Sequence, residues 1–135
     1  MLSPDAAPNH WDVIEGQGSL FHPAYAGVSL GLLHGSQPDV IVLCHDPMRA
    51  TMLGYPGYPL PGLLEAIDLT LRLGARVNPA IRCAGVSMNT SRMDEAEALR
   101  TIEDATASLR LPVADAIRGG KAFEALVESC LGRGP

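Results

Sequence analysis

The residues best suited to chemistry follow four short apolar runs of the sequence, and the first run ends in Glu15. A carboxylate at the end of a strand can hold Mg²⁺ directly or through water, or act as a general base once desolvated. It can equally accept backbone N–H bonds from the turn that follows. The sequence favours Glu15 as a catalytic or metal-binding group and leaves the structural alternative open.

The turn after this acid supplies further candidates for ligand binding. Gly16 and Gly18 would let backbone amides approach an anion, although the same glycines suit an ordinary turn. Gln17 and Ser19 stand beside them as candidate pocket residues. His22 follows at the predicted entrance of a helix, where it either acts in catalysis or fills a structural position.

Other candidates follow the second and third apolar runs. His45 comes directly after a buried run, and Arg49 carries a fork suited to phosphate or carboxylate. Asn89 can read a base or amide edge with its paired donor and acceptor, and Thr90 follows it. A structural histidine, a solvated arginine and an Asx turn are the respective alternatives for the first three.

The elements that must position these residues alternate along the chain. Continuous apolar, β-branched runs predict strands covered on both faces, at residues 11–14, 39–44, 83–88 and 112–115. Helical spacing predicts four helices between and after them, at residues 24–34, 62–77, 94–109 and 120–131. The order predicts one α/β domain over residues 11–131, after an irregular segment 1–10, with a parallel sheet and helices on both faces. Ligands bind beyond the carboxyl ends of such strands, so the candidates should converge there.

One predicted connection, residues 45–61, is unusually long. Loops of this length inside a compact domain are uncommon and are often functional. Its prolines predict an ordered flap rather than a flexible linker. Tyr55 and Tyr58 either cover a ligand or only stiffen this flap.

Composition excludes several classes of function. The 135-residue chain has a net charge of −5 and no cluster of lysine and arginine, which argues against a nucleic-acid surface. No apolar run reaches membrane-spanning length, and the first residues lack the pattern of a signal peptide. Three cysteines without metal-type spacing indicate reduced thiols, so we expect a soluble cytoplasmic protein that binds a small molecule.

Several stretches together resemble one protein family. "DVIEGQGSLFHPAYAGVSLGLLHGSQPD", "VLCHDP", "GYPGYPLP", "NPAIRCAGVSMNTS" and "LPVADAIRGG" are similar to the carboxyl-terminal domain of the DgcN-type, D-glutamate N-acetyltransferase-like family, formerly a domain of unknown function. The resemblance covers residues 12–131, and "EGQGSLFHP" is its most specific part. It implies an incomplete P-loop NTPase-like fold, similar to that of dethiobiotin and cobyrinate synthetases.

The resemblance also implies roles for single residues. Glu15 matches a metal-associated acid of those synthetases, Gly16 and Gly18 match its glycines, and Asn89 matches an asparagine that reads a nucleotide base. The cofactor is then acetyl-CoA, or ATP with Mg²⁺. Under the acetyltransferase reading, Arg49 would hold an anionic group of the substrate or donor.

This chain departs from the family pattern in what it lacks. These 135 residues include no Gly-x-x-x-x-Gly-Lys-Ser/Thr loop, and we expect that the family's amino-terminal domain is missing from this chain as well. We therefore expect part of an enzyme that acts on a small amino acid. The alternative is a truncated, inactive module that binds ligand weakly or assembles with a partner chain, including a second copy of itself.

Overall fold

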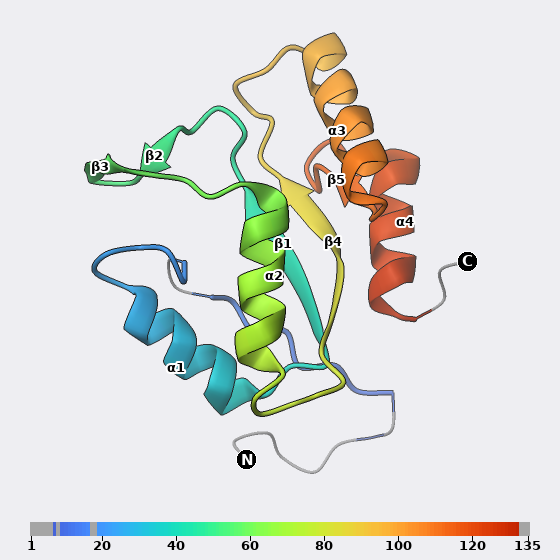
Figure 1. Cartoon of the computed structure of the whole chain (residues 1–135). Helices are drawn as coiled ribbons and strands as arrows, with labels where there is room; N and C mark the ends of the chain where they lie inside the picture. The colour runs from blue at the N-terminus through green and yellow to red at the C-terminus, as the bar shows by residue number, and fades with distance from the viewer. Residues whose placement is uncertain (1–6, 8, 17–18, 133–135) are drawn as a thin grey trace.

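The computed structural model describes residues 7, 9–16 and 19–132, and its centre is a parallel sheet. The sheet has three strands in the order β1 (Val40–His45), β4 (Arg82–Met88) and β5 (Val113–Ala114). β1 pairs with β4 from Val40 opposite Arg82 to His45 opposite Met88. All three strands therefore end at the same edge, beside the upper loops in Figure 1.

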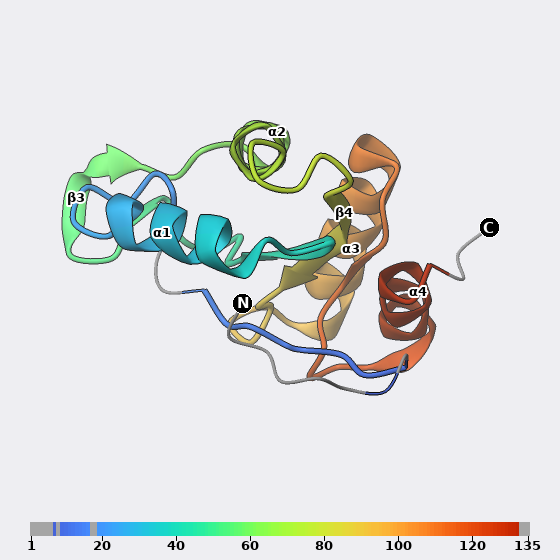
Figure 2. The same cartoon turned by 90° about the horizontal axis from the view of Figure 1, so that it is seen from below.

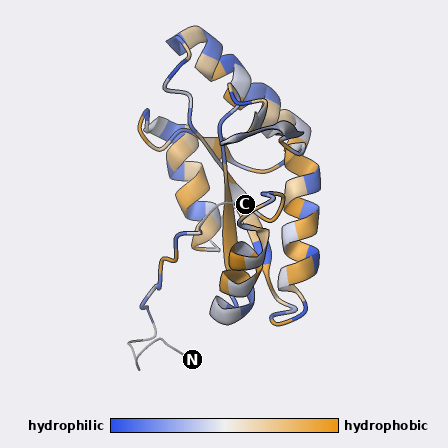
Figure 3. Cartoon of the chain, turned by 90° about the vertical axis from the view of Figure 1, so that its left-hand side faces the viewer, coloured by the Kyte–Doolittle hydropathy of each residue, from blue (hydrophilic) through white to orange (hydrophobic). Residues whose placement is uncertain are grey.

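Helices cover both faces of this sheet, as the sequence predicts. α2 (Leu63–Gly74) and α3 (Glu95–Leu109) contribute Ile67 and Ile102 to the core, against Val86 and Met88 of β4. α4 (Gly120–Cys130) packs on the opposite face, where Figure 2 shows it on the far side of the strands from α2. Hydrophobic residues are concentrated in the strands and alternate with polar residues along the helices (Figure 3).

α1 (Ala26–Ser36) lies beside α2 rather than over the sheet. Nε2 of His34 in α1 lies 3.0 Å from the carbonyl oxygen of Leu73 in α2, and this hydrogen bond joins the two helices. The sequence predicts that this helix ends at residue 34, but it continues to Ser36. Gln37 takes the left-handed conformation, at φ 50°, and its N–H bonds to the Leu33 carbonyl.

The predicted first strand, at residues 11–14, is wrong. Residues 11–16 form no strand, and 93% of the Val13 surface is exposed. In the described part of the chain β1 pairs only with β4, so this short apolar run has no strand paired with it. Without that partner its backbone bonds and side-chain burial cannot offset the entropy of ordering. The sheet consequently has three parallel strands, not four.

The long connection after β1 is more ordered than a loop. It contains a two-stranded antiparallel hairpin, β2 (Thr51–Met52) and β3 (Tyr55–Pro59), which projects beside the carboxyl edge of the sheet (Figure 1). Within the hairpin, Met52 of β2 is buried, whereas every residue of β3 is exposed. The predicted flap is therefore confirmed as ordered, with secondary structure that the sequence did not indicate.

The remaining helices and strands agree with their predictions within a few residues at each end. α3 is capped by Asp94, whose carboxylate accepts the Glu97 N–H at 2.8 Å. No helix among the described residues is long and apolar enough to cross a membrane. Cys44, Cys83 and Cys130 are free thiols.

One close contact fixes the distance between β4 and β5. A Cβ at Gly85 would lie 2.2 Å from the Pro112 carbonyl oxygen and 2.6 Å from Leu126 Cδ1. The same carbonyl accepts the Val86 N–H at 2.9 Å. Only glycine lets this strand, this carbonyl and α4 pack at the observed separation.

We expect Gly85→Ala to lower the free energy of unfolding by about 2 kcal/mol or more, because the methyl group overlaps backbone as well as side chain. Gly31→Ala is the matched control, since Gly31 lies inside α1 with open space around it. Alanine there should be neutral or stabilise by about 0.5–1 kcal/mol. Urea denaturation measures both, and a Gly85→Ala variant as stable as the parent chain would contradict this packing.

Candidate functional site

A groove crosses the carboxyl edge of the sheet and has two lobes. The larger lobe, of about 610 Å³, lies between β1, the hairpin and the start of α1. The smaller lobe, of about 360 Å³, lies over the ends of β4 and β5. Both lobes are lined by the same four residues at the end of β1, namely Cys44, His45, Asp46 and Arg49. The end of β1 is therefore the floor that joins them.

Asp46 holds two arginines at this junction. Nη2 of Arg92 lies 2.8 Å from each carboxylate oxygen, and Nη2 of Arg49 lies 3.6 Å from Oδ2. Partial burial would raise the pKa of Asp46, but hydrogen bonds from Arg92 and the Met48 N–H outweigh it and lower the pKa. One carboxylate faces two guanidinium groups, so the cluster carries one net positive charge that can attract an anion.

His45 is a neutral imidazole on the floor of the groove at neutral pH. Burial lowers its pKa below the ordinary value of 6.5, and the negative charge of Asp46 offsets this only in part. A neutral imidazole can accept a proton, which is the requirement for a general base. The neighbouring Cys44 thiol stays protonated, because desolvation raises its pKa and the charge of Glu15 raises it further.

His22 is 7% exposed and lines the larger lobe. Its Nδ1 accepts the Ala24 N–H at 3.1 Å, so in the neutral ring the proton is on Nε2. Its ring packs against Tyr25 and Tyr55, with centroids 4.7 and 5.0 Å away. This arrangement makes His22 a hydrogen-bond donor rather than a base.

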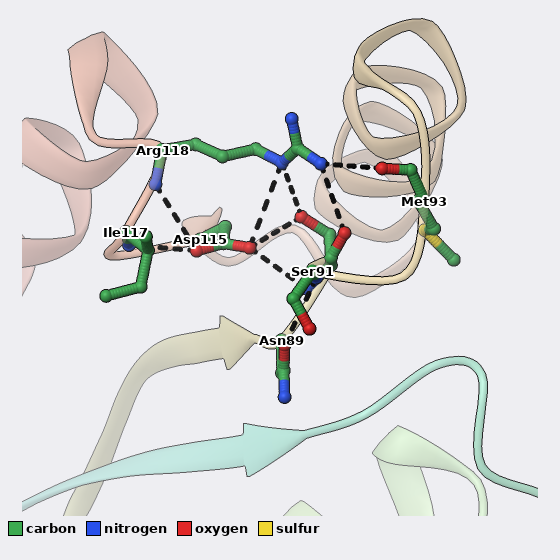
Figure 4. Close-up of polar contacts among 7 residues, drawn as sticks. Asn89, Ser91, Met93, Asp115, Ile117 and Arg118 are labelled. Atoms are coloured by element: carbon green, nitrogen blue, oxygen red, sulfur yellow. Dashed lines mark hydrogen bonds and ion pairs between the residues drawn. The ribbon is translucent and has the colours of Figure 1, made fainter.

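A buried carboxylate joins the loops that follow β4 and β5. Oδ2 of Asp115, a residue 5% exposed, accepts the Thr90 N–H at 2.9 Å and the Thr90 hydroxyl at 2.5 Å. Its Oδ1 accepts the Ile117 N–H at 2.9 Å. Nε of Arg118 donates to the Thr90 hydroxyl at 2.7 Å and its Nη2 to the Met93 carbonyl at 2.9 Å (Figure 4). These contacts hold the two loops together.

This network also sets the position of Asn89. The Asn89 N–H donates to the His45 carbonyl at 2.8 Å, which continues the pairing of β1 and β4 past their ends. Its side-chain oxygen accepts the Ser91 N–H at 3.1 Å, so the alternative of an Asx turn is confirmed. Asn89 lines the smaller lobe nonetheless.

The groove brings together some of the predicted site residues and leaves out others. It is lined by Ser19, His22, His45, Arg49 and Asn89. Thr90 is fully buried, and its hydroxyl is engaged by Asp115 and Arg118, so it supports the site from behind.

Four further predicted site residues, from Glu15 to Gly18, are not assigned to the groove. Glu15 and Gly16 are exposed and do not line either lobe. Glu15 is near enough to Cys44 to affect its pKa, and its catalytic role stays a prediction. Gln17 and Gly18 lie outside the described residues.

Three residues that shape the groove were not among the predicted site residues, although the sequence placed Asp46 and Asp115 at the strand ends. Asp46 and Asp115 each follow a strand, and their position after it is the signal that could have selected them. Arg92 gave no such signal, because it reaches Asp46 across 46 residues of sequence.

The described residues contain no cluster of three protein ligands for a metal ion. Over residues 7, 9–16 and 19–132 no group of three or more His, Cys, Asp or Glu side chains could hold a metal ion. Glu15 therefore belongs to no such group in this range, its role as a metal ligand stays a prediction, and no step of the chemistry below passes through Mg²⁺.

Comparison with known proteins finds a family whose function is unknown and two relatives with a named activity. A family profile described as "Domain of unknown function (DUF1611_C) P-loop domain" matches residues 1–127. Proteins from Tritonibacter scottomollicae and a Pseudoalteromonas species, both named D-glutamate N-acetyltransferase, are each 44% identical over 119 residues. The match covers 88% of this chain but 36% of each relative, so this chain spans little more than a third of their length.

A solved structure supports the fold. The crystal structure of a DUF1611 family protein from Anabaena variabilis superposes with a TM-score of 0.79 at 31% sequence identity. The superposition covers 87% of this chain and 34% of that one. The expected family resemblance and the α/β, P-loop-like fold class are therefore confirmed.

We expect Asp115→Asn to lower the free energy of unfolding by about 2–4 kcal/mol at pH 7, because an amide cannot accept all the bonds of this buried carboxylate. Burial would raise the pKa of Asp115, but hydrogen bonds from Thr90, Ile117 and Arg118 lower it below 3.8. A lowered carboxyl pKa stabilises the fold above its unfolded value, and that contribution is lost as pH falls through the folded value.

The difference in free energy of unfolding between the parent chain and Asp115→Asn should therefore be largest at pH 5–7. It should shrink toward pH 2, since the unfolded pKa is about 3.8. Asp68→Asn is the matched control, since its pair with Arg72 is exposed on α2. It should change stability by less than about 0.5 kcal/mol. A difference that does not vary with pH would show that the Asp115 charge is not what stabilises these loops.

Proposed function

We propose, because the chain belongs to the DUF1611 P-loop domain family, that it forms the substrate-binding carboxyl-terminal part of a D-glutamate N-acetyltransferase-like enzyme. The observation that carries the proposal is the groove at the strand ends. It places a neutral histidine, His45, beside Arg49 and within a lobe that Asn89 also lines. The relatives' name supplies the reaction, and the groove supplies groups suited to it.

The chemistry asks two things of the groove. An amino-acid substrate must be held by its carboxylates, and its ammonium group must lose a proton before the nitrogen can attack. The cluster of Arg49, Arg92 and Asp46 carries net positive charge where the two lobes meet, so it suits this requirement and can also face an anionic group of the acyl donor. His45 suits the second, because its lowered pKa leaves it free of a proton at neutral pH.

In the proposed reaction, the substrate nitrogen gives a proton to His45 and attacks the thioester carbonyl of acetyl-CoA. The C–N bond forms, the C–S bond breaks, and the leaving thiolate takes up the second proton that the nitrogen loses on becoming an amide. His22 contributes a hydrogen bond from Nε2 within the larger lobe. A Walker-type loop is not part of this proposal, since the sequence has none despite the family's description.

A second candidate is a module that completes its site with a partner chain, or with a second copy. Two observations support it. α1 is rich in apolar residues yet buries none of them completely, and Val28 is more than half exposed. The apolar residues Trp11, Val13 and Ile14 are likewise exposed on a segment that pairs with no described strand.

The test is product formation by the full chain. We expect the 135-residue protein to convert D-glutamate and acetyl-CoA to N-acetyl-D-glutamate, measured by chromatography and mass spectrometry. Activity should fall as the pH drops through the lowered pKa of His45, with a midpoint below 6.5, because only the neutral ring accepts the proton. His45→Asn should lose about 100-fold or more in kcat and remove this acidic limb.

Arg72→Ala is the control, because Arg72 is exposed on α2 and lines neither lobe. It should retain full activity. A chain that makes no product at any pH, and that elutes from size exclusion as an oligomer, would refute the first candidate and favour the second. Unchanged activity in His45→Asn would refute the assignment of the base.

A further inference from the structure

The larger lobe has a wall of aromatic rings that the proposed proton transfer does not require. We call His22, Tyr25 and Tyr55 the aromatic wall, since all three line the lobe. The His22 ring meets Tyr55 edge to face at 5.0 Å and Tyr25 at a tilt at 4.7 Å. Tyr58 braces Tyr55 from the hairpin, again edge to face, with centroids 6.0 Å apart.

The aromatic wall is not part of the hydrophobic core. Tyr55 is 37% exposed, and Tyr25 and Tyr58 are about half exposed, whereas the core under the sheet is made of aliphatic residues. The three apolar side chains that complete the lobe are Met52, Leu53 and Leu60. Exposed ring surface beside aliphatic side chains in a concave site suits a flat, largely apolar ligand group.

The same lobe presents a positive charge. Arg49 lines it together with Asp46, which also binds Arg92, so one negative charge faces two positive ones. The fork of an arginine binds phosphate through paired N–H donors. A ligand that fits the whole lobe therefore has a planar ring at one end and an anionic group within reach of the guanidinium.

We propose that the larger lobe is the donor subsite, where the aromatic wall stacks the heteroaromatic ring of a nucleotide-type handle and Arg49 binds its phosphate. This inference rests on the proposed function, because it assigns the lobe to the acyl donor of that reaction. The smaller lobe, with Asn89, then takes the amino acid, which has no ring to stack. His45 lines both lobes and so lies between donor and acceptor.

Calorimetric titration of the full chain with adenosine 3′,5′-bisphosphate tests the subsite without any turnover. Tyr55→Leu should weaken binding by about tenfold or more, because base–aromatic stacking is lost. Tyr55→Phe keeps the ring face and should stay within about twofold of the parent chain. It also separates stacking from any effect of the leucine on the hairpin.

Two further titrations separate the contribution of the ligand's ring from that of its phosphate. Arg49→Ala should weaken the bisphosphate by about tenfold but leave adenosine, which has no phosphate, within about twofold. Arg72→Ala, the exposed control on α2, should change neither ligand. D-Glutamate binding should be insensitive to Tyr55→Leu.

The inference is overturned if the parent chain does not bind the bisphosphate at millimolar concentration, or if Tyr55→Leu binds it as tightly as the parent. Either result can coexist with formation of N-acetyl-D-glutamate, in which case only the location of the donor is wrong. Tyr55-dependent nucleotide binding in a chain that makes no product would instead refute the acetyl transfer and leave the ring subsite in place.

Discussion

The buried carboxylate of Asp115 is the interaction on which the candidate site depends most. It accepts bonds from two loops at once, the one after β4 through Thr90 and the one after β5 through Ile117. Each bond stays favourable only while the carboxylate is charged and shielded from water, since a buried charge without partners is costly. By fixing Thr90 it also fixes Asn89, whose N–H bonds to the carbonyl of His45. A single network thus connects all three strand ends, and the smaller lobe of the groove is the space that it leaves.

Charge is distributed in the groove so that two neighbouring groups have different tasks. Asp46 is held ionised by hydrogen bonds from Arg92 and Met48, whereas burial keeps His45 neutral. The result is a local positive cluster in a chain whose net charge is −5. An anionic substrate would meet its binding groups and a proton acceptor on adjacent residues of one strand end. The aromatic wall opposite them, supplied by the hairpin and the start of α1, offers a different chemistry to the second reactant.

The sequence predicted the helices and strands whose local residue pattern is distinctive. It failed where the formation of a strand depends on pairing with another strand. Apolar runs and helical spacing located β1, β4, β5 and all four helices, because burial on both faces leaves a continuous apolar signal. The same signal at residues 11–14 was misleading, since a strand requires a paired neighbour and none of the described strands pairs with it. The rule that strand ends carry ligands selected His45 and Asn89 as candidates, and both residues line the groove. The bond from Arg92 to Asp46 could not be read, because it joins distant segments without any spacing rule.

The central claim is that the substrates bind at the carboxyl edge of the sheet, and ligand-induced changes in ¹H–¹⁵N correlation spectra of the full chain test it most directly. Addition of D-glutamate should shift, saturably, the backbone amides of residues 44–46, 48–49 and 87–90, which form the floor and the smaller lobe. Amides in the last turns of α2 and α4, residues 71–74 and 127–130, lie at the opposite edge of the sheet, beside Ile81 and Arg82, and should stay unchanged. Saturable shifts confined to those helices, or no shift at millimolar ligand, would contradict the account.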